Sequence, residues 1–212
     1  METIRLALEN IANPPEKVRL MYGAVSELVR EQNDIGTLKV ADITARAGIG
    51  KGTAYEYFSS KEELIANALA YEYACKIKEL AERAVQRSGF RDRCYCVMDW
   101  LVENRDYNLM FSRILRFSFG ETGCEVWKDH IENKLQKEVM DYLCSMIDQV
   151  MEEGFREECF TEEKPSLRRF AFLSAMVQYA FVIMGPQDKS FLQMSEKELR
   201  EYVYCSMIKA LS

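Results

Sequence analysis

Residues 40–64 read VADITARAGIGKGTAYEYFSSKEEL, and this stretch decides the expected fold. Val40, Ile43 and Ala47 recur at helical spacing, so one side of a short helix can face a core. Gly48 follows at once, and glycine readily takes the positive φ angle that ends a helix and lets the chain turn sharply. The pattern therefore predicts a short helix, a tight turn and a second short helix.

The second short helix, from about Lys51, combines an apolar side with a polar one. Ala54 and Phe58 are available to pack inward. The other positions carry groups that reach phosphates or base edges, or leave room for a close approach: Lys51, Gly52, Thr53, Tyr55 and Tyr57. Two short helices joined by a glycine turn, the second exposing such groups, are typical of a helix-turn-helix that binds DNA.

These residues resemble a known family. The segments GIGKGTAYEYF (48–58) and SKEEL (60–64) are similar to the amino-terminal DNA-binding domain of TetR-family (tetracycline-repressor-like) transcriptional regulators. The resemblance implies a repressor that binds a palindromic double-stranded DNA operator as a homodimer and is released by a small-molecule effector. It also implies DNA contacts at the matching positions, which are Lys51, Gly52, Thr53, Tyr55, Tyr57 and Lys61.

The chemistry of these side chains suits such contacts. Lys51 can reach a phosphate or a guanine edge, and Thr53 can bond a phosphate or touch a thymine methyl group. Lys61 stands at the expected start of the next helix, where its charge and the free amide groups both favour phosphate. Tyr55 and Tyr57 can donate their hydroxyls to the DNA backbone, or pack half-buried against the protein.

Three positions depart from the usual family pattern. Lys39 stands where Ser or Thr commonly caps the first short helix, and Thr44 replaces a frequent alanine. Both are candidates for additional phosphate contacts, or are solvated surface. Glu56 places a carboxylate near the expected DNA face, where it either accepts from a cytosine amino group or points away and weakens phosphate attraction.

Composition sets the outer limits. The chain has 212 residues, of which 48% are hydrophobic and 29% are charged, enough for a substantial core. There is no apolar run of about eighteen residues and no signal-peptide pattern, which predicts a cytoplasmic protein without a membrane partner. Seven scattered cysteines without a C-x-x-C pair predict free thiols and no structural zinc. Residues 1–61 carry eight basic and eight acidic side chains, so the net charge of −6 resides in the rest. A net negative charge does not exclude DNA binding. The small DNA-contacting part of the protein around the second short helix, which we name the reading head, needs only a local basic face.

The whole chain is expected to be all-α. A helix begins near Pro15 and runs to about Gln32, and Ser60 with Glu63 forms a capping box that opens a long helix toward Arg87. Further helical patterns follow over residues 91–103, 107–117, 121–153, 165–184 and 196–211. We therefore expect an amino-terminal three-helix helix-turn-helix domain over residues 1–59. A larger helical ligand-binding and dimerisation domain would occupy residues 60–212.

The second domain contains candidates for a dimer interface and for an effector-binding pocket. Residues 170–184 are apolar almost all round, so this helix is either an ordinary buried core helix or half of a four-helix dimer interface with the last helix; the family resemblance favours the dimer. A mostly apolar pocket between helices suits a small hydrophobic effector. The candidate lining residues, for each of which ordinary core or solvated surface is the alternative, are Trp100, Tyr107, Phe111, Phe117, Trp127 and the single histidine, His130.

No catalytic constellation is evident. His130 lies among surface charges, and no base stands near a nucleophile, so the sequence predicts neither an enzyme nor a bound cofactor or metal. The favoured function is a ligand-responsive transcriptional regulator. The alternative is a helical small-molecule-binding or redox-sensing module with weak or no DNA affinity, which Glu56 and the acidic total would favour.

Overall fold

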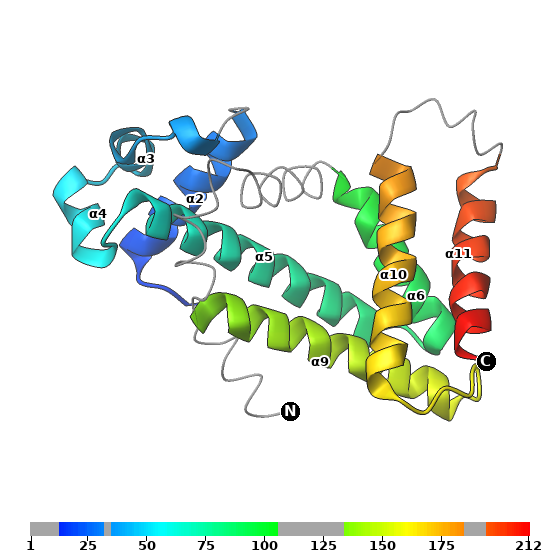
Figure 1. Cartoon of the computed structure of the whole chain (residues 1–212). Helices are drawn as coiled ribbons and strands as arrows, with labels where there is room; N and C mark the ends of the chain where they lie inside the picture. The colour runs from blue at the N-terminus through cyan, green and yellow to red at the C-terminus, as the bar shows by residue number, and fades with distance from the viewer. Residues whose placement is uncertain (1–12, 32–34, 106–133, 185–193) are drawn as a thin grey trace. The chain divides into compact units, whose positions relative to one another are not determined.

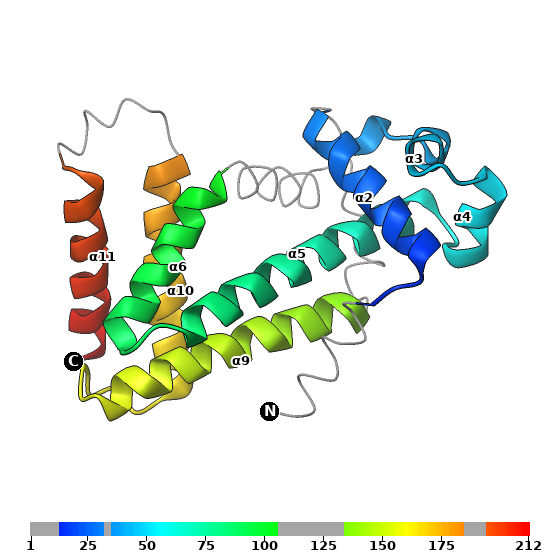
Figure 2. The same cartoon turned by 180° about the vertical axis from the view of Figure 1, so that it is seen from behind.

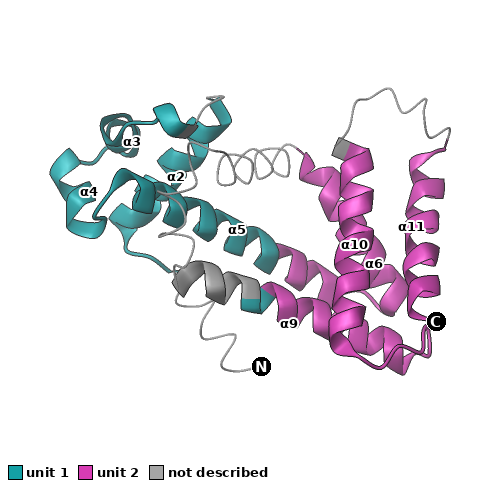
Figure 3. Ribbon diagram, viewed as in Figure 1, with its two compact units in different colours: residues 1–78, 110–142 teal, residues 79–109, 143–212 magenta. Residues whose placement is uncertain are grey.

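The computed structural model describes residues 13–31, 35–105, 134–184 and 194–212, and every regular element in these ranges is helical. Figure 1 shows the helices in chain order, and the expected all-α fold is confirmed. The chain divides into two compact units, residues 1–78 with 110–142 and residues 79–109 with 143–212 (Figure 3). The functional division after residue 59 stays a prediction.

Four helices of the first unit carry the predicted motif. They are α2 (Glu16–Glu31), α3 (Val40–Ala47), α4 (Lys51–Tyr57) and the first part of α5 (Lys61–Val85), with a short 3₁₀ turn at Ile35–Thr37 between α2 and α3. The apolar stripe of α2 is buried as its spacing predicts, from Val18 through Met21 and Val25 to Leu28. Burying one such side chain contributes about 1.5–3 kcal/mol.

Aromatic rings connect α2 with two of its neighbours. Tyr22 of α2 lies with its ring centroid 6.0 Å from that of Phe58 and 5.2 Å from that of Tyr71 on α5. Burial is the largest cause that raises the pKa of Tyr22, to about 12. This ring therefore remains neutral and packs as part of the core between the helices.

A serine starts α5, but the predicted capping box is only half present. The Ser60 Oγ accepts from the Glu63 backbone N–H at 3.0 Å, as a capping serine should. The Glu63 carboxylate, however, accepts from the backbone N–H of Ser59 at 2.7 Å and also from the Ser59 hydroxyl. The cap is thus made by two successive serines.

The second unit contains α6 (Phe90–Glu103), α10 (Pro165–Met184) and α11 (Glu196–Leu211), with the later part of α9 (Lys134–Arg156). Figures 1 and 2 show α10 beside both α6 and α11, in agreement with their contacts. Its core contains Met98 and Trp100 of α6, Met151 of α9 and Tyr179 of α10. The helices predicted over 165–184 and 196–211 have the bounds expected from sequence.

Two predicted helices reach residues that the structure does not describe. The expected helix over 107–117 lies outside the described residues. The expected helix over 121–153 is described only from Lys134, and there it continues to Arg156. Within it Met146 and Val150, four residues apart and so on one face of the helix, are both buried.

Candidate nucleic-acid interface

The turn between α3 and α4 is closed by backbone hydrogen bonds. Gly48 has φ 68° and ψ 29°, the left-handed conformation that glycine adopts without steric cost. Its N–H donates to the Ala45 carbonyl at 3.2 Å, and the N–H of Ile49 donates to the Thr44 carbonyl at 2.9 Å. This pair of bonds is a Schellman motif, which satisfies the last carbonyls of α3 and directs the chain into α4.

The two faces of α4 differ as the sequence predicts. Ala54 and Phe58, at the end of the helix, are buried and attach it to the core of the first unit. The opposite side chains are exposed, including Lys51 at the first position. Tyr55 is 53% exposed and Tyr57 is 42% exposed, so neither ring packs fully against the protein. Thr53 is half-buried, and Gly52 is exposed with no atom within 4 Å of the place where a Cβ would stand.

The charges on this surface are of mixed sign. Lys51 forms no ion pair or hydrogen bond with any described residue, and the same holds for Lys39, which precedes α3 without a side-chain cap. Lys61 is less available, because its Nζ donates to the Gly36 carbonyl at 3.1 Å and lies 3.7 Å from a Glu62 oxygen. Glu56, like Lys51, is exposed to solvent.

Thr44 requires a correction. It was a candidate for a phosphate contact, but it is only 3% exposed and its hydroxyl donates to the Val40 carbonyl at 2.9 Å. The spacing could have shown this, since Thr44 follows Val40 by four residues and so lies on the same inner face of α3. We therefore leave Thr44 out of the proposed DNA-binding surface.

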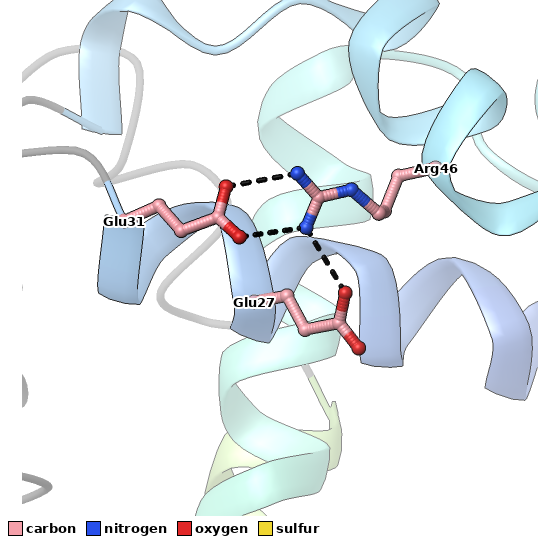
Figure 4. Close-up of polar contacts among 3 residues, drawn as sticks. All are labelled: Glu27, Glu31 and Arg46. Atoms are coloured by element: carbon pink, nitrogen blue, oxygen red, sulfur yellow. Dashed lines mark hydrogen bonds and ion pairs between the residues drawn. The ribbon is translucent and has the colours of Figure 1, made fainter.

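Sequence reasoning did not assign a role to Arg46, which is a central polar residue of this unit (Figure 4). Its guanidinium from α3 donates to Glu31 of α2 at 2.9 and 2.8 Å and to Glu27 at 3.1 Å. The hydrogen bond from Arg46 lowers the pKa of Glu31. The arrangement is a bidentate arginine–carboxylate pair joined by a second carboxylate.

Of the candidate effector-binding residues, Trp100 is the one that lies within the described part of the chain. Tyr107, Phe111, Phe117, Trp127 and His130 lie outside the described residues. Trp100 lies on α6 in the second unit, where its side chain is buried and its indole Nε1 has no hydrogen-bond partner among the described residues. In the same unit burial raises the pKa of the Tyr179 hydroxyl, which lies near Arg200.

The helix-turn-helix matches a family of known proteins. Residues 29–68, from the end of α2 into α5, match the family model described as bacterial regulatory proteins, tetR family. This segment, 40 of the chain's 212 residues, is similar to that family. No curated protein matches this chain.

Solved structures share the fold of this chain at low sequence identity. The transcriptional regulator FadR from Bacillus subtilis, solved in complex with stearoyl-CoA, is 15% identical and has a TM-score of 0.64, covering 92% of this chain and 99% of its own. A TetR transcription regulator from Haloarcula marismortui is 16% identical with a TM-score of 0.61, covering 92% and 96%. FadR from Bacillus halodurans is 14% identical with a TM-score of 0.64 over the same shares.

Among the described residues no group of three or more His, Cys, Asp or Glu side chains is placed to hold a metal ion. None of the described helices combines the length and the apolar character that crossing a bilayer requires.

Proposed function

We propose that this protein is a ligand-responsive transcriptional repressor that binds a palindromic operator through the exposed face of α4 and is released by a small hydrophobic effector. The observation that carries the proposal is the two-sided character of α4. Its inner residues fix the helix to the core, and its outer face presents Lys51, Tyr55 and Tyr57 to solvent beside a bare glycine. A helix fixed to the core in this way can insert its exposed face into a major groove while its buried face stays packed.

The proposed DNA contacts differ in their expected roles. Lys51 and Gly52 lie at the first turn of α4, where a recognition helix contacts base edges, and the Lys51 ammonium would also neutralise a phosphate there. In this proposal Tyr55, Tyr57 and Lys39 would contact phosphates, which set the register but carry no sequence information. Lys61 would join them after exchanging its bond to the Gly36 carbonyl for a phosphate. Thr53 is the half-buried member of the set.

We propose that the repressor acts as a homodimer joined through α10. One side of α10 is buried within the second unit, where it includes Phe172, Tyr179 and Ile183. The other side carries a stripe of large apolar side chains that are exposed, with Phe170 at 70%, Val177 at 66% and Phe181 at 74%. An exposed apolar stripe of this kind marks an interaction surface. Two reading heads about 34–36 Å apart would match successive major grooves of a palindrome.

Release would follow from coupling between the two sites. An effector that binds the second domain and prefers a wider spacing of the reading heads lowers operator affinity by the same factor by which DNA lowers effector affinity. The unpaired Trp100 indole nitrogen gives such a ligand one donor within a mostly apolar core. B. subtilis FadR was solved with stearoyl-CoA, which supports testing acyl chains first.

A redox-sensing role receives less support. Reactive cysteines have lowered pKa values, because the thiolate is the reacting species. Burial is the largest cause that raises the thiol pKa of Cys75, Cys94 and Cys159. For Cys205 the hydrogen bond with Glu201 is the largest cause, and its direction is also upward. These four thiols are therefore poorly activated.

The deciding experiment measures binding to duplex DNA as a function of salt. The probe is the duplex enriched by in vitro selection from a random library, and affinity is followed over a range of salt concentrations. Each lost phosphate contact reduces the steep negative slope by about one. We expect Lys51→Ala to reduce the slope by this amount and the matched Lys197→Ala, on α11, to leave it unchanged. Failure to enrich any duplex, or a flat salt response, would favour the helical small-molecule-binding alternative.

A further inference from the structure

Helix α2 bonds its two neighbours through two pairs of side chains that are offset by one residue. Ser26 and Arg30 both contact Glu72 of α5, with the Ser26 Oγ donating at 2.5 Å and the Arg30 guanidinium at 2.5 Å. Glu27 and Glu31 both accept from Arg46 of α3 (Figure 4). Residues four apart share a helix face and consecutive residues differ by about 100°. A different pair thus faces each neighbour.

The geometry of the two contacts is specific. The side chain of Glu72 is mostly buried and receives both a hydroxyl and a guanidinium. Arg46 bonds both oxygens of Glu31 and one oxygen of Glu27, so its plane is fixed by three hydrogen bonds. A bidentate pair fixes orientation as well as distance, which a single exposed ion pair does not. We name the first set the α5 clamp (Ser26, Arg30 and Glu72) and the second the α3 clamp (Glu27, Glu31 and Arg46).

Both clamps lie behind the proposed reading head. Arg46 is on α3 just before the Gly48 turn, and the turn directs the chain into α4. A displacement of α3 on α2 would therefore move Lys51 and the rest of the exposed face. A displacement of α5 relative to α2 would reach the same residues through Glu72.

We propose that α2 acts as an adaptor whose α3 and α5 clamps set the orientation of the reading head, with Arg46, Glu27, Glu31 and Glu72 as positioning residues for operator binding. This inference rests on the proposed function, since it assigns roles within the same DNA-binding unit. In this proposal the Arg46 guanidinium pairs with the carboxylates of Glu27 and Glu31 and does not contact a phosphate. Glu27 and Glu31 assist DNA binding although they are negative.

Whether the removal of Glu27 and Glu31 weakens or strengthens DNA binding tests the proposal. By charge alone, removing Glu27 and Glu31 should tighten DNA binding, because two negative groups leave the surface and Arg46 is freed for phosphate. If the carboxylates position α3, their removal should weaken binding instead. The variants are Arg46→Met, the double variant Glu27→Gln with Glu31→Gln, and the triple combination, each measured on the selected duplex over a range of salt concentrations.

We expect Arg46→Met and the double glutamine variant each to weaken operator binding roughly five-fold, the scale of a modest ion-pair network. The triple variant should lose no more than either one, because both remove the same contact. The salt slope should remain that of the wild type. A slope reduced by about one in Arg46→Met, or tighter binding by the double variant, would overturn the positioning role, as would affinities unchanged throughout.

The α5 clamp is tested by Glu72→Gln, which keeps the side-chain shape but removes the charge that pairs with Arg30. Operator binding should weaken with an unchanged salt slope, and the matched Glu16→Gln, exposed in the first turn of α2, should bind like the wild type. Wild-type affinity for Glu72→Gln would refute the α5 half. Helical content and melting temperature of every variant identify simple unfolding, in which case Arg46→Lys and Arg30→Lys, which keep the charge, replace the failed variants. Absence of duplex binding by the wild type would refute the proposed function itself, which separates the two failures.

Discussion

Two helical glycines of the first unit provide a matched pair of residues. Gly52 on α4 and Gly23 on α2 are both exposed, and a Cβ at either position would meet no atom within 4 Å. Glycine within a helix costs about 0.5–1 kcal/mol relative to alanine, because it loses more conformational freedom on folding. Only Gly52 lies on the surface that we propose to enter the groove.

We therefore predict that Gly52→Ala and Gly23→Ala each raise the free energy of unfolding by about 0.5–1 kcal/mol, as measured by urea denaturation. Gly52→Ala should nevertheless weaken operator binding, because its methyl group occupies the space of close backbone approach, whereas Gly23→Ala should bind as the wild type does. Equal operator affinity of both variants would remove Gly52 from the interface.

The residue scale also shows where sequence reasoning was sufficient. The buried Ala54 and Phe58 and the left-handed Gly48 followed from periodicity and turn chemistry alone. The partners of Arg46 did not, because Glu27 and Glu31 lie 19 and 15 positions away in the chain. Only the packing angle of α2 on α3 decides which surface charges meet, and local patterns carry no information about that angle.

At the scale of helices, the close approach of α9 to α6 depends on one glycine. A Cβ at Gly154 would stand 2.7 Å from two ring atoms of Phe90 and 2.8 Å from Phe160 Cε1. Phe90 and Phe160 are both buried, with ring centroids 5.6 Å apart, so neither can move aside freely. Cβ atoms in proteins are not found this close to other heavy atoms, so an alanine here would force the rings or the helix backbone to shift.

We predict that Gly154→Ala lowers the free energy of unfolding by about 1–3 kcal/mol through overpacking, although alanine is the better helix former. Urea denaturation followed by circular dichroism measures the loss. Gly154→Ala combined with Phe160→Leu, which gives back space, should recover part of it. Wild-type stability of the single variant would mean that the two rings can separate at little cost.

Helix bounds were the most predictable elements. Helix α10 ends at Met184, just before Gly185-Pro186, and α11 begins after Ser195, whose Oγ accepts from the Glu198 N–H at 3.3 Å. The Glu198 carboxylate accepts in return from the Ser195 N–H, which completes a capping box that the S-x-x-E spelling could have revealed. The Ser60 cap differed because Glu63 bonds Ser59, a choice that depends on side-chain rotamers and not on spacing.

At the scale of the whole molecule, the exposed stripe on α10 bears on assembly. Changing Val177 and Phe181 together to glutamate should convert a dimer to monomers, because four carboxylates would then face one another across the proposed interface. Both side chains are mostly exposed, so the melting temperature of the isolated subunit should change little. Sedimentation velocity reports the mass, and binding to the full palindrome should weaken.

The matched control for this change is Leu20→Glu on α2, another exposed apolar residue that lies outside the stripe. It should remain dimeric. A double glutamate variant that keeps the mass of the wild-type dimer would place the interface elsewhere. The alternative interpretation, in which α10 is an ordinary core helix that packs only through its buried face, would then hold.

A subunit that pairs through such a stripe responds to its own abundance. Pairing varies with the square of the subunit concentration, so a cell holding few copies would leave the target promoter open, and a small increase in gene dosage would close it over a narrow range. In the proposed repressor, the same apolar side chains that are costly to expose in a single copy would thereby set the concentration at which repression begins.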